Sequence, residues 1–151
     1  MTDPSLIHHA FSLERRYPAL PREVFAAWSD PQAKRRWLTN GQGQHTLDFR
    51  VGGLELTRVQ GDSGKMLAFE SRYLDIIDEK RIVYASTLTA DGELATTSIT
   101  SVELQAEDDV TILVLTESDV FLDGQEEPSW REHGTAEQLD TLGVELQTGA
   151  R

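Results

Sequence analysis

The chain has 151 residues, no cysteine and a formal net charge of −12, from 26 acidic and 14 basic side chains. This length is that of one domain with a sizeable core, and the absence of cysteine excludes disulfides, thiolate nucleophiles and zinc-cysteine sites. Eleven of the acidic residues and none of the basic ones lie between Ile82 and Trp130, which argues against a nucleic-acid or anionic-membrane partner. We expect a single domain over residues 1–151.

No stretch approaches the roughly 18 unbroken apolar residues of a membrane span, and the N-terminal segment MTDPSLIHH lacks a basic start followed by an apolar run. We therefore expect a cytoplasmic protein that does not associate with membranes. The basic run is Lys34, Arg35 and Arg36. On the exposed side of a short helix such a run usually serves solvation, and contact with an anion or a partner protein is the alternative.

The segment before residue 40 is predicted to form one strand and two short helices. Apolar and polar residues alternate from His9 to Tyr17, which is typical of a half-buried strand. Proline suits the first position of a helix, so helices are predicted to begin at Pro21 and at Pro31, the second capped by Asp30. Their buried faces carry Val24, Phe25, Trp28, Ala33 and Trp37.

From His45 to Glu117 nearly every signal favours strands joined by short turns that are rich in glycine and aspartate. The predicted strands are His45–Phe49, Leu54–Val59, Met66–Ile77, Arg81–Thr89, Ala95–Leu104 and Val110–Thr116. Because the connections are short, consecutive strands should pair in an antiparallel meander.

The segment Ser129–Gln147 is predicted to form the long helix that covers this sheet. Ser129 and Glu132 fit a capping box, Pro128 stands just outside it, and Gly149 is placed to end the helix. At about 100° per residue, one side of the helix is an apolar stripe that must be buried. The stripe consists of Ala136, Leu139, Leu142, Gly143 and Leu146.

Two polar residues of this helix, Glu132 and Thr135, lie above the stripe, where they would point under the helix. For Glu132 the alternative is to fold back onto the Ser129 amide, as the capping box requires. The order of elements is then strand, two short helices, six strands and a long helix, an α+β plan with a curved sheet around the last helix.

Three segments carry a resemblance to a known family: LERRYPALPREVFAAWSDPQAKRRWL, DFRVGGLELTR and VLTESDVFLDGQEEPSWREHGTAEQLDTLGVEL. They resemble the SRPBCC (START-like, polyketide-cyclase-like) superfamily, in the branch named after the heat-shock protein 90 ATPase activator. The resemblance implies the helix-grip fold. In that fold a curved antiparallel sheet of about seven strands closes on a long C-terminal helix around a deep cavity, with two short helices after strand one.

Standard catalytic and cofactor motifs are absent from the sequence. The histidines are His8, His9, His45 and His133, and no pair of them has the spacing of a metal site. Gly61 to Lys65 reads as a hairpin turn rather than a phosphate-binding loop. We therefore expect neither a metal nor a cofactor.

The predicted function depends on a cavity under the last helix, where Gly143 on the inner face leaves space. The candidate ligand-binding residues are Trp37, Phe49, Phe69, Arg72, Tyr84, Phe121, Thr135 and Leu139, with Thr97 and Ser101 as further polar candidates. Core packing is an equal explanation for any one of the aromatics. A slip of one residue in strand register would exchange the inward and outward sets.

Acid-base catalysis would fall to Glu132 with His133 or Tyr84, in the manner that the cyclase relatives suggest. Consecutive helix positions diverge by about 100°, so Glu132 and His133 do not easily face one substrate atom.

The favoured hypothesis is therefore a protein that binds a small apolar or aromatic ligand. One alternative is a cofactor-independent enzyme of the polyketide cyclase or aromatase type. Another is a stress-related, co-chaperone-like module that binds a protein partner. A homodimer formed through an exposed strand or helix is compatible with each of them.

Overall fold

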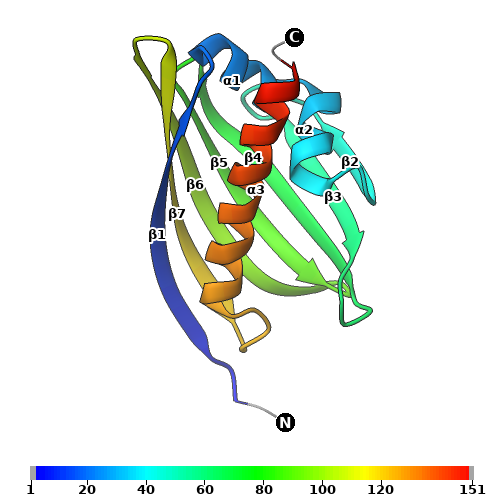
Figure 1. Cartoon of the computed structure of the whole chain (residues 1–151). Coiled ribbons are helices and arrows are strands. Elements are labelled where there is room, and N and C mark those ends of the chain that lie inside the picture. The colour runs from blue at the N-terminus through cyan, green and yellow to red at the C-terminus, as the bar shows by residue number, and fades with distance from the viewer. Residues whose placement is uncertain (1–2, 150–151) are drawn as a thin grey trace.

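The computed structural model describes residues 3–149. Within them, seven strands form one antiparallel sheet, and three helices lie on its concave side (Figure 1). The strands are β1 (Leu6–Tyr17), β2 (Gln44–Leu47), β3 (Leu54–Gln60), β4 (Met66–Ile77), β5 (Arg81–Ala90), β6 (Glu93–Glu107) and β7 (Val110–Leu122). The helices are α1 (Pro21–Ser29), α2 (Pro31–Thr39) and α3 (Pro128–Gly149). The predicted α+β helix-grip fold is confirmed.

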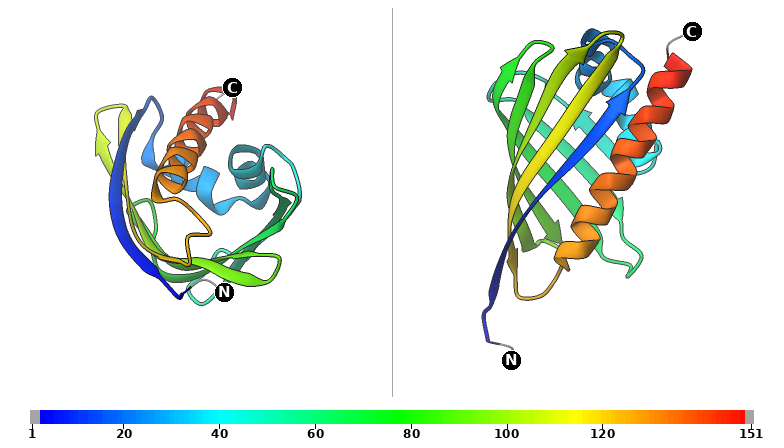
Figure 2. Two further views of the ribbon diagram at one scale, coloured as in Figure 1. Left: turned by 90° about the horizontal axis from the view of Figure 1, so that it is seen from below. Right: turned by 60° about the vertical axis from the view of Figure 1, so that its left-hand side comes forward.

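The sheet has the order β1-β7-β6-β5-β4-β3-β2, so the first strand pairs with the last at one edge. All other neighbours are consecutive in the chain, as expected for a meander joined by short turns. Seen from the end, the sheet curves around α3, and α1 and α2 lie beside α3 on the concave side of the sheet (Figure 2). Both short helices contact α3.

The two short helices begin as the prolines predict. Pro21 and Pro31 occupy first-turn positions, where the missing amide costs nothing. The Asp30 carboxylate caps α2 by accepting a hydrogen bond from the Ala33 amide at 2.9 Å. The predicted start of α2 is therefore confirmed.

The start of α3 differs from the prediction. The helix begins at Pro128, and the Glu127 carbonyl accepts hydrogen bonds from the amides of Trp130 and Arg131 at 3.0 and 3.4 Å. Proline at the first helical position needs no amide partner, so no serine cap is required. The predicted capping box at Ser129 is wrong, because the Glu132 carboxylate lies 3.5 Å from the His9 ring rather than at the Ser129 amide.

Strand β7 runs to Leu122, beyond the predicted end at Thr116. Glu117 and Asp119, which follow the predicted end, are both buried on the inner face of the strand. Continued pairing of this segment with β1 and β6 satisfies its backbone.

The core lies under the second half of α3. Leu139, Leu142 and Leu146 are buried there, so the predicted stripe is confirmed at these positions. The space expected at Gly143 is filled by the Tyr17 ring, since a Cβ at Gly143 would lie 3.3 Å from Tyr17 Cε1. The Tyr17 hydroxyl donates to the Leu139 carbonyl at 2.7 Å. No helix within residues 3–149 is long and apolar enough to cross a membrane.

Candidate functional site

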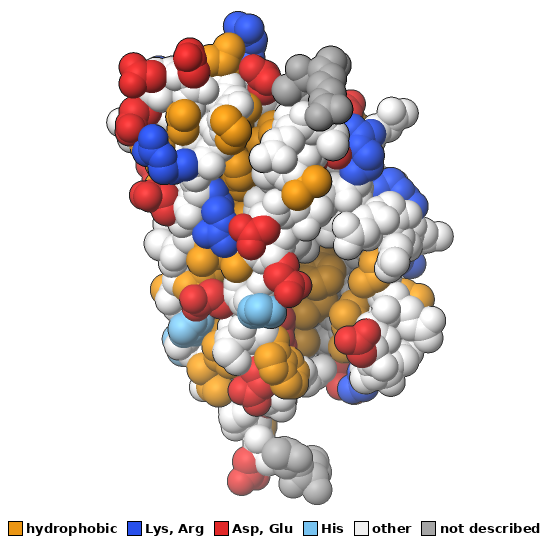
Figure 3. All heavy atoms as spheres, viewed as in Figure 1, with side chains coloured by type: hydrophobic (Ala, Val, Ile, Leu, Met, Phe, Trp, Pro, Cys, Tyr) orange, Lys and Arg blue, Asp and Glu red, His pale blue; other side chains and the backbone are white. Residues whose placement is uncertain are grey.

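A cavity of about 470 Å³ lies between the concave face of the sheet, α2 and the first half of α3. It opens beside α3, where Figure 3 shows a hollow lined with hydrophobic side chains. All three tryptophans of the chain, Trp28, Trp37 and Trp130, line it, together with Phe69 and Tyr84. This size and aromatic lining are typical of pockets that hold small organic molecules.

The structure brings five of the eight predicted ligand-binding residues to this cavity. They are Trp37, Phe69, Tyr84, Thr135 and Leu139. Each of the five lies on the face of its helix or strand that also carries buried neighbours, so the helical and strand periods explain why it reaches the cavity.

The other three predicted residues, Phe49, Arg72 and Phe121, lie elsewhere. The Phe49 ring follows β2 and packs edge-on against Phe25 and Tyr73, with centroids 5.5 and 5.0 Å apart. Arg72 is exposed on the outer face of β4, and its guanidinium donates to the Gly52 carbonyl at 3.0 Å.

Phe121 is fully buried on β7, close to the end of that strand and outside the cavity lining. On β6 the inward residues are Ser98 and Thr100 rather than the candidates Thr97 and Ser101, which lie on the opposite face of the strand.

The three acid-base candidates do not form one constellation. Glu132 contacts His9, and the exposed His133 ring contacts Glu137 at 3.0 Å. Tyr84 lines the cavity, and burial raises the pKa of its hydroxyl, which disfavours it as a base.

At one end of the cavity lies a buried ionic cluster that the sequence did not reveal. The Lys34 ammonium is 2.6 Å from Glu55 Oε1, which also accepts a hydrogen bond from the Tyr73 hydroxyl at 2.6 Å. The other oxygen, Oε2, lies 2.7 Å from the His45 ring. Lys34 is 2 % exposed, so its expected place on the solvated side of the helix is wrong. Its spacing of three residues from Trp37 was the available signal, since both share one helix face.

Electrostatics hold this cluster in its charged form. Burial on its own would raise the pKa of Glu55, but the Lys34 charge and the hydrogen bonds from His45, Lys34 and Tyr73 lower it to about 2. The Lys34 ammonium also lies 4.9 Å from the centroid of the Trp28 ring. In this cluster the Lys34 cation is thus balanced by the Glu55 carboxylate, and both residues line the cavity.

A second charged cluster lies where β7 meets the start of α3. The Arg131 guanidinium holds the Glu126 carboxylate with two nitrogens, the shortest contact being 2.8 Å, and lies 3.6 Å from Glu117 Oε2. Thr96 donates to Glu126 at 2.6 Å, and Thr100 donates to Glu117 Oε1 at 3.0 Å. Glu117, Glu126 and Arg131 all line the cavity.

Next to this cluster, both Asp119 oxygens are buried with no hydrogen-bond partner among the described residues. Burial and the neighbouring Glu117 raise the pKa of Asp119 to about 8. A neutral carboxyl is the form that such a site favours at pH 7.

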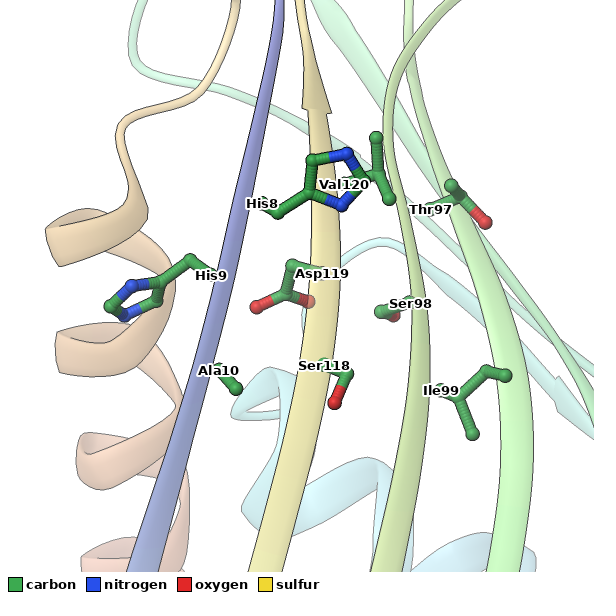
Figure 4. A pocket seen from close by; sticks show the side chains of 9 residues that line it. All are labelled: His8, His9, Ala10, Thr97, Ser98, Ile99, Ser118, Asp119 and Val120. Atoms are coloured by element: carbon green, nitrogen blue, oxygen red, sulfur yellow. The ribbon is translucent and has the colours of Figure 1, made fainter.

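A shallower hollow lies on the convex side of the sheet (Figure 4). Figure 4 shows His8 in front of β7, whereas His9 points toward α3, so the two histidines lie on opposite faces of the sheet. Between residues 3 and 149 no group of three or more histidine, aspartate or glutamate side chains is placed to hold a metal ion.

Comparisons with known proteins agree with this architecture. Residues 18–147 match the family model described as Activator of Hsp90 ATPase homolog 1-like protein. An uncharacterized protein from Rhizobium leguminosarum is 37% identical, with a TM-score of 0.92 over 97% of this chain and 99% of that chain. The Mll3558 protein from Rhizobium loti is also 37% identical, with a TM-score of 0.88 over 93% of this chain and 99% of that one.

More distant structures share the fold alone. DynU16, a protein of the dynemicin biosynthetic locus, is 18% identical, with a TM-score of 0.70 over 93% of this chain and 48% of its own. A comparison with curated protein sequences gives no match. The similarities therefore identify a fold and a family, and the cavity has to be interpreted from its own residues.

Proposed function

Because this chain belongs to the family of Activator of Hsp90 ATPase homolog 1-like proteins, we propose that it uses the helix-grip cavity of that fold to bind a small, mostly apolar or aromatic molecule. The observation that carries the proposal is the cavity of about 470 Å³ under α3, walled by Trp28, Trp37, Phe69, Tyr84 and Trp130. Flat aromatic walls with a few polar groups bind flat organic molecules by burying apolar surface.

The alternatives have less support in the geometry. A cyclase or aromatase needs a positioned acid-base pair, and Glu132 and His133 contact His9 and Glu137 rather than Tyr84. A partner-binding module that uses the basic run needs an exposed patch, and Lys34 is buried in an ion pair with Glu55.

The test uses a substitution in the cavity wall that fills the cavity. Gly134 of α3 lines the cavity, and a Cβ placed there meets no atom within 4 Å. Gly134→Phe should therefore fill the cavity without displacing the helix. Val144→Phe is the matched control, because Val144 lies on the same helix with 60% of its surface exposed.

The probe is N-phenyl-1-naphthylamine, a neutral aromatic whose emission rises in apolar surroundings, and quenching of the cavity tryptophans gives a second signal. We expect the native protein and Val144→Phe to bind the probe, and Gly134→Phe to bind at least about tenfold more weakly. Equal binding by all three proteins, with circular dichroism showing each one folded, would place the probe outside the cavity and refute the proposal.

A further inference from the structure

Two hydrogen-bond donors in the cavity wall have no acceptor among the residues that the structure describes. They are the Nη1 atom of Arg131, on α3, and the hydroxyl of Tyr84, on β5. The polar side-chain atoms that are both buried and unpartnered lie on Trp28, Glu117 and Asp119, so these two donors keep accessible surface. Because both side chains line the cavity, both donors are available to a bound molecule.

The Arg131 guanidinium is fixed by two of its nitrogens, and the third remains free. Nε and Nη2 hold Glu126 at distances of 2.8 to 3.3 Å, whereas Nη1 lies 3.6 Å from Glu117 Oε2, beyond hydrogen-bond distance. The Arg131 Cζ atom lies 5.8 Å from the centroid of the Phe69 ring, which also lines the cavity. The Arg131 side chain is only 11% exposed, and an N–H group that has lost water without gaining an acceptor costs free energy.

Tyr84 supplies a neutral donor near this guanidinium. Tyr84 lies opposite Thr100 on β6, and Thr100 lies opposite Glu117 on β7. Arg131 approaches the same Glu117, so the two donors flank this row of residues at its two ends. Thr100 donates its own hydrogen to Glu117, and the Tyr84 hydroxyl is left without a partner. Burial and the charges of Glu117 and Glu55 raise the pKa of Tyr84, so its hydroxyl keeps the hydrogen at neutral pH.

A neutral oxygen acceptor suits these donors better than an anion. Glu117 and Glu126 lie in the same wall and face the single positive charge of Arg131, so they would repel a carboxylate. A carbonyl oxygen carries no net charge and has two lone pairs, which two donors can share. The Phe69 ring beside Arg131 offers a flat apolar surface for the ring system that carries such a carbonyl.

We infer that the cavity takes a neutral aromatic ketone, whose carbonyl oxygen accepts hydrogen bonds from Arg131 Nη1 and from the Tyr84 hydroxyl. The inference rests on the proposed function and adds the polar group of the ligand and the residues that bind it. The bond from the charged guanidinium is the stronger of the two, and the Tyr84 hydroxyl fixes the direction of the carbonyl.

The test compares three naphthalenes that share one ring system: 6-propionyl-2-(dimethylamino)naphthalene as the ketone, its 6-propyl analogue without the oxygen, and its 6-carboxylate analogue as the anion. Each is titrated into the native protein, Tyr84→Phe, Arg131→Lys and Tyr17→Phe. Arg131→Lys keeps the positive charge and removes the forked donors. Tyr17→Phe is the matched control for Tyr84→Phe, because Tyr17 is buried outside the cavity lining, where its hydroxyl donates to the Leu139 carbonyl.

We expect the native protein to bind the ketone about tenfold more tightly than the propyl analogue, and the carboxylate least tightly. Burial of apolar surface alone would favour the propyl analogue, so the order of affinities itself identifies a contact with the oxygen. Tyr84→Phe and Arg131→Lys should each lower the ratio of ketone to propyl affinity at least about threefold, whereas Tyr17→Phe should keep it. The emission of this ketone shifts to longer wavelength when its oxygen accepts a hydrogen bond, so it should shift back to shorter wavelength in Tyr84→Phe.

The outcomes separate the two proposals. Propyl binding as tight as ketone binding in the native protein, or a ratio and an emission that Tyr84→Phe leaves unchanged, would overturn the ketone inference while leaving a ligand-binding cavity. Binding of none of the three probes would count against the cavity function and the inference together. If Arg131→Lys does not fold, the native order of affinities and the Tyr84→Phe variant decide, since the Tyr84 hydroxyl has no partner within residues 3–149 to lose.

Discussion

Lys34 and Arg36 are near neighbours on α2, yet their charges have different energetic roles. The Lys34 side chain is 3% exposed, and its partner Glu55 is also buried. The Arg36 guanidinium is 57% exposed and holds Glu145 at 2.8 Å. A buried charge that loses its partner stays desolvated, whereas a surface charge is taken up by water.

Removing either partner of the buried pair should therefore destabilise the protein strongly. We expect Lys34→Met to lower the free energy of unfolding by about 3–5 kcal/mol, and Arg36→Ala by less than about 1 kcal/mol. The double variant Lys34→Met, Glu55→Gln should lose less than the sum of its single variants, because no buried charge remains unpaired. Urea unfolding followed by tryptophan emission measures the native protein, the single variants Lys34→Met, Glu55→Gln and Arg36→Ala, and the double variant. Equal losses for Lys34→Met and Arg36→Ala would contradict this account.

Because of Asp119, we expect the free energy of unfolding to fall as pH rises, whereas most acidic residues make it rise with pH. Its pKa rises from an ordinary 3.8 to about 8 in the folded protein, so the folded state holds the proton more tightly. Its stabilising contribution is complete below about pH 4, declines as pH rises, and is lost above about pH 8. The charged groups around it are Glu117, Glu126, Arg131 and, opposite on β1, His9.

The Asp119→Asn variant isolates this effect, since the surrounding groups are kept. The free energy of unfolding of Asp119→Asn minus that of the native protein should increase by more than about 1 kcal/mol from pH 5 to pH 8. The check is urea unfolding of both proteins at the two pH values. An identical pH dependence of the two proteins would show that Asp119 does not hold its proton in the folded state.

At the scale of elements, α3 has two functional halves. In the first half, one face lines the cavity, while Leu142 and Leu146 of the second half pack in the core. The cavity-lining residues of α3 are Trp130, Arg131, Gly134, Thr135, Gln138 and Leu139. Each half has a glycine in its interior, and these two glycines have different surroundings. Gly134 has open space where a Cβ would be, whereas Gly143 lies against the Tyr17 ring.

Replacing these glycines with alanine should therefore have opposite outcomes. Gly134→Ala should stabilise by about 0.5–1 kcal/mol, because alanine loses less backbone entropy in a helix. Gly143→Ala should give no gain or a loss, since its Cβ would lie 3.3 Å from Tyr17 Cε1 and the Tyr17 hydroxyl is fixed to the Leu139 carbonyl. Thermal unfolding ranks the variants, and a gain at Gly143 equal to that at Gly134 would show that Tyr17 moves freely.

The type and order of the helices and strands were more predictable than the residues at which they begin and end. Alternation, short turns and proline placement predicted the meander of six consecutive strands and both short helices, because period and local sterics act over a few residues. The pairing of β1 with β7 was not predicted, because these strands are far apart in the sequence. The end of β7 was missed because Glu117 and Asp119 are acidic and yet buried. The Glu117 carboxylate contacts Arg131 and Thr100, and the strand lies between β1 and β6, all of them distant in the sequence.

At the scale of the whole molecule, the cavity was predictable as a feature of the fold, but its polar wall was not. Aromatic residues such as Trp37 and Tyr84 are expected inside, and they are found there. Lys34 was predicted on the solvated side of its helix, and Glu55 and Glu117 were not among the predicted site residues, since charge normally indicates exposure. Only the three-dimensional pairing of Lys34 with Glu55, 21 residues away in sequence, makes their burial favourable.

The overall charge leads to a final prediction. With a net charge of −12, mutual repulsion destabilises the folded state. Exposed ion pairs such as Arg16–Glu107 and Arg81–Asp75 contribute little each, and the buried Lys34–Glu55 pair is poorly screened by salt. We therefore expect the melting temperature at about pH 7.5 to rise between roughly 20 and 200 mM NaCl, because screening relieves repulsion more than it weakens pairs.

The control for this prediction is the same salt series near the sequence pI of about 4.6, where the net charge vanishes and the gain should disappear. Differential scanning calorimetry measures both series. A melting temperature that falls with salt at about pH 7.5 would mean that surface pairs stabilise this fold more than its net charge destabilises it. The acidic segment between Ile82 and Trp130 would then be compensated locally, through contacts such as those of Glu117 and Glu126 with Arg131.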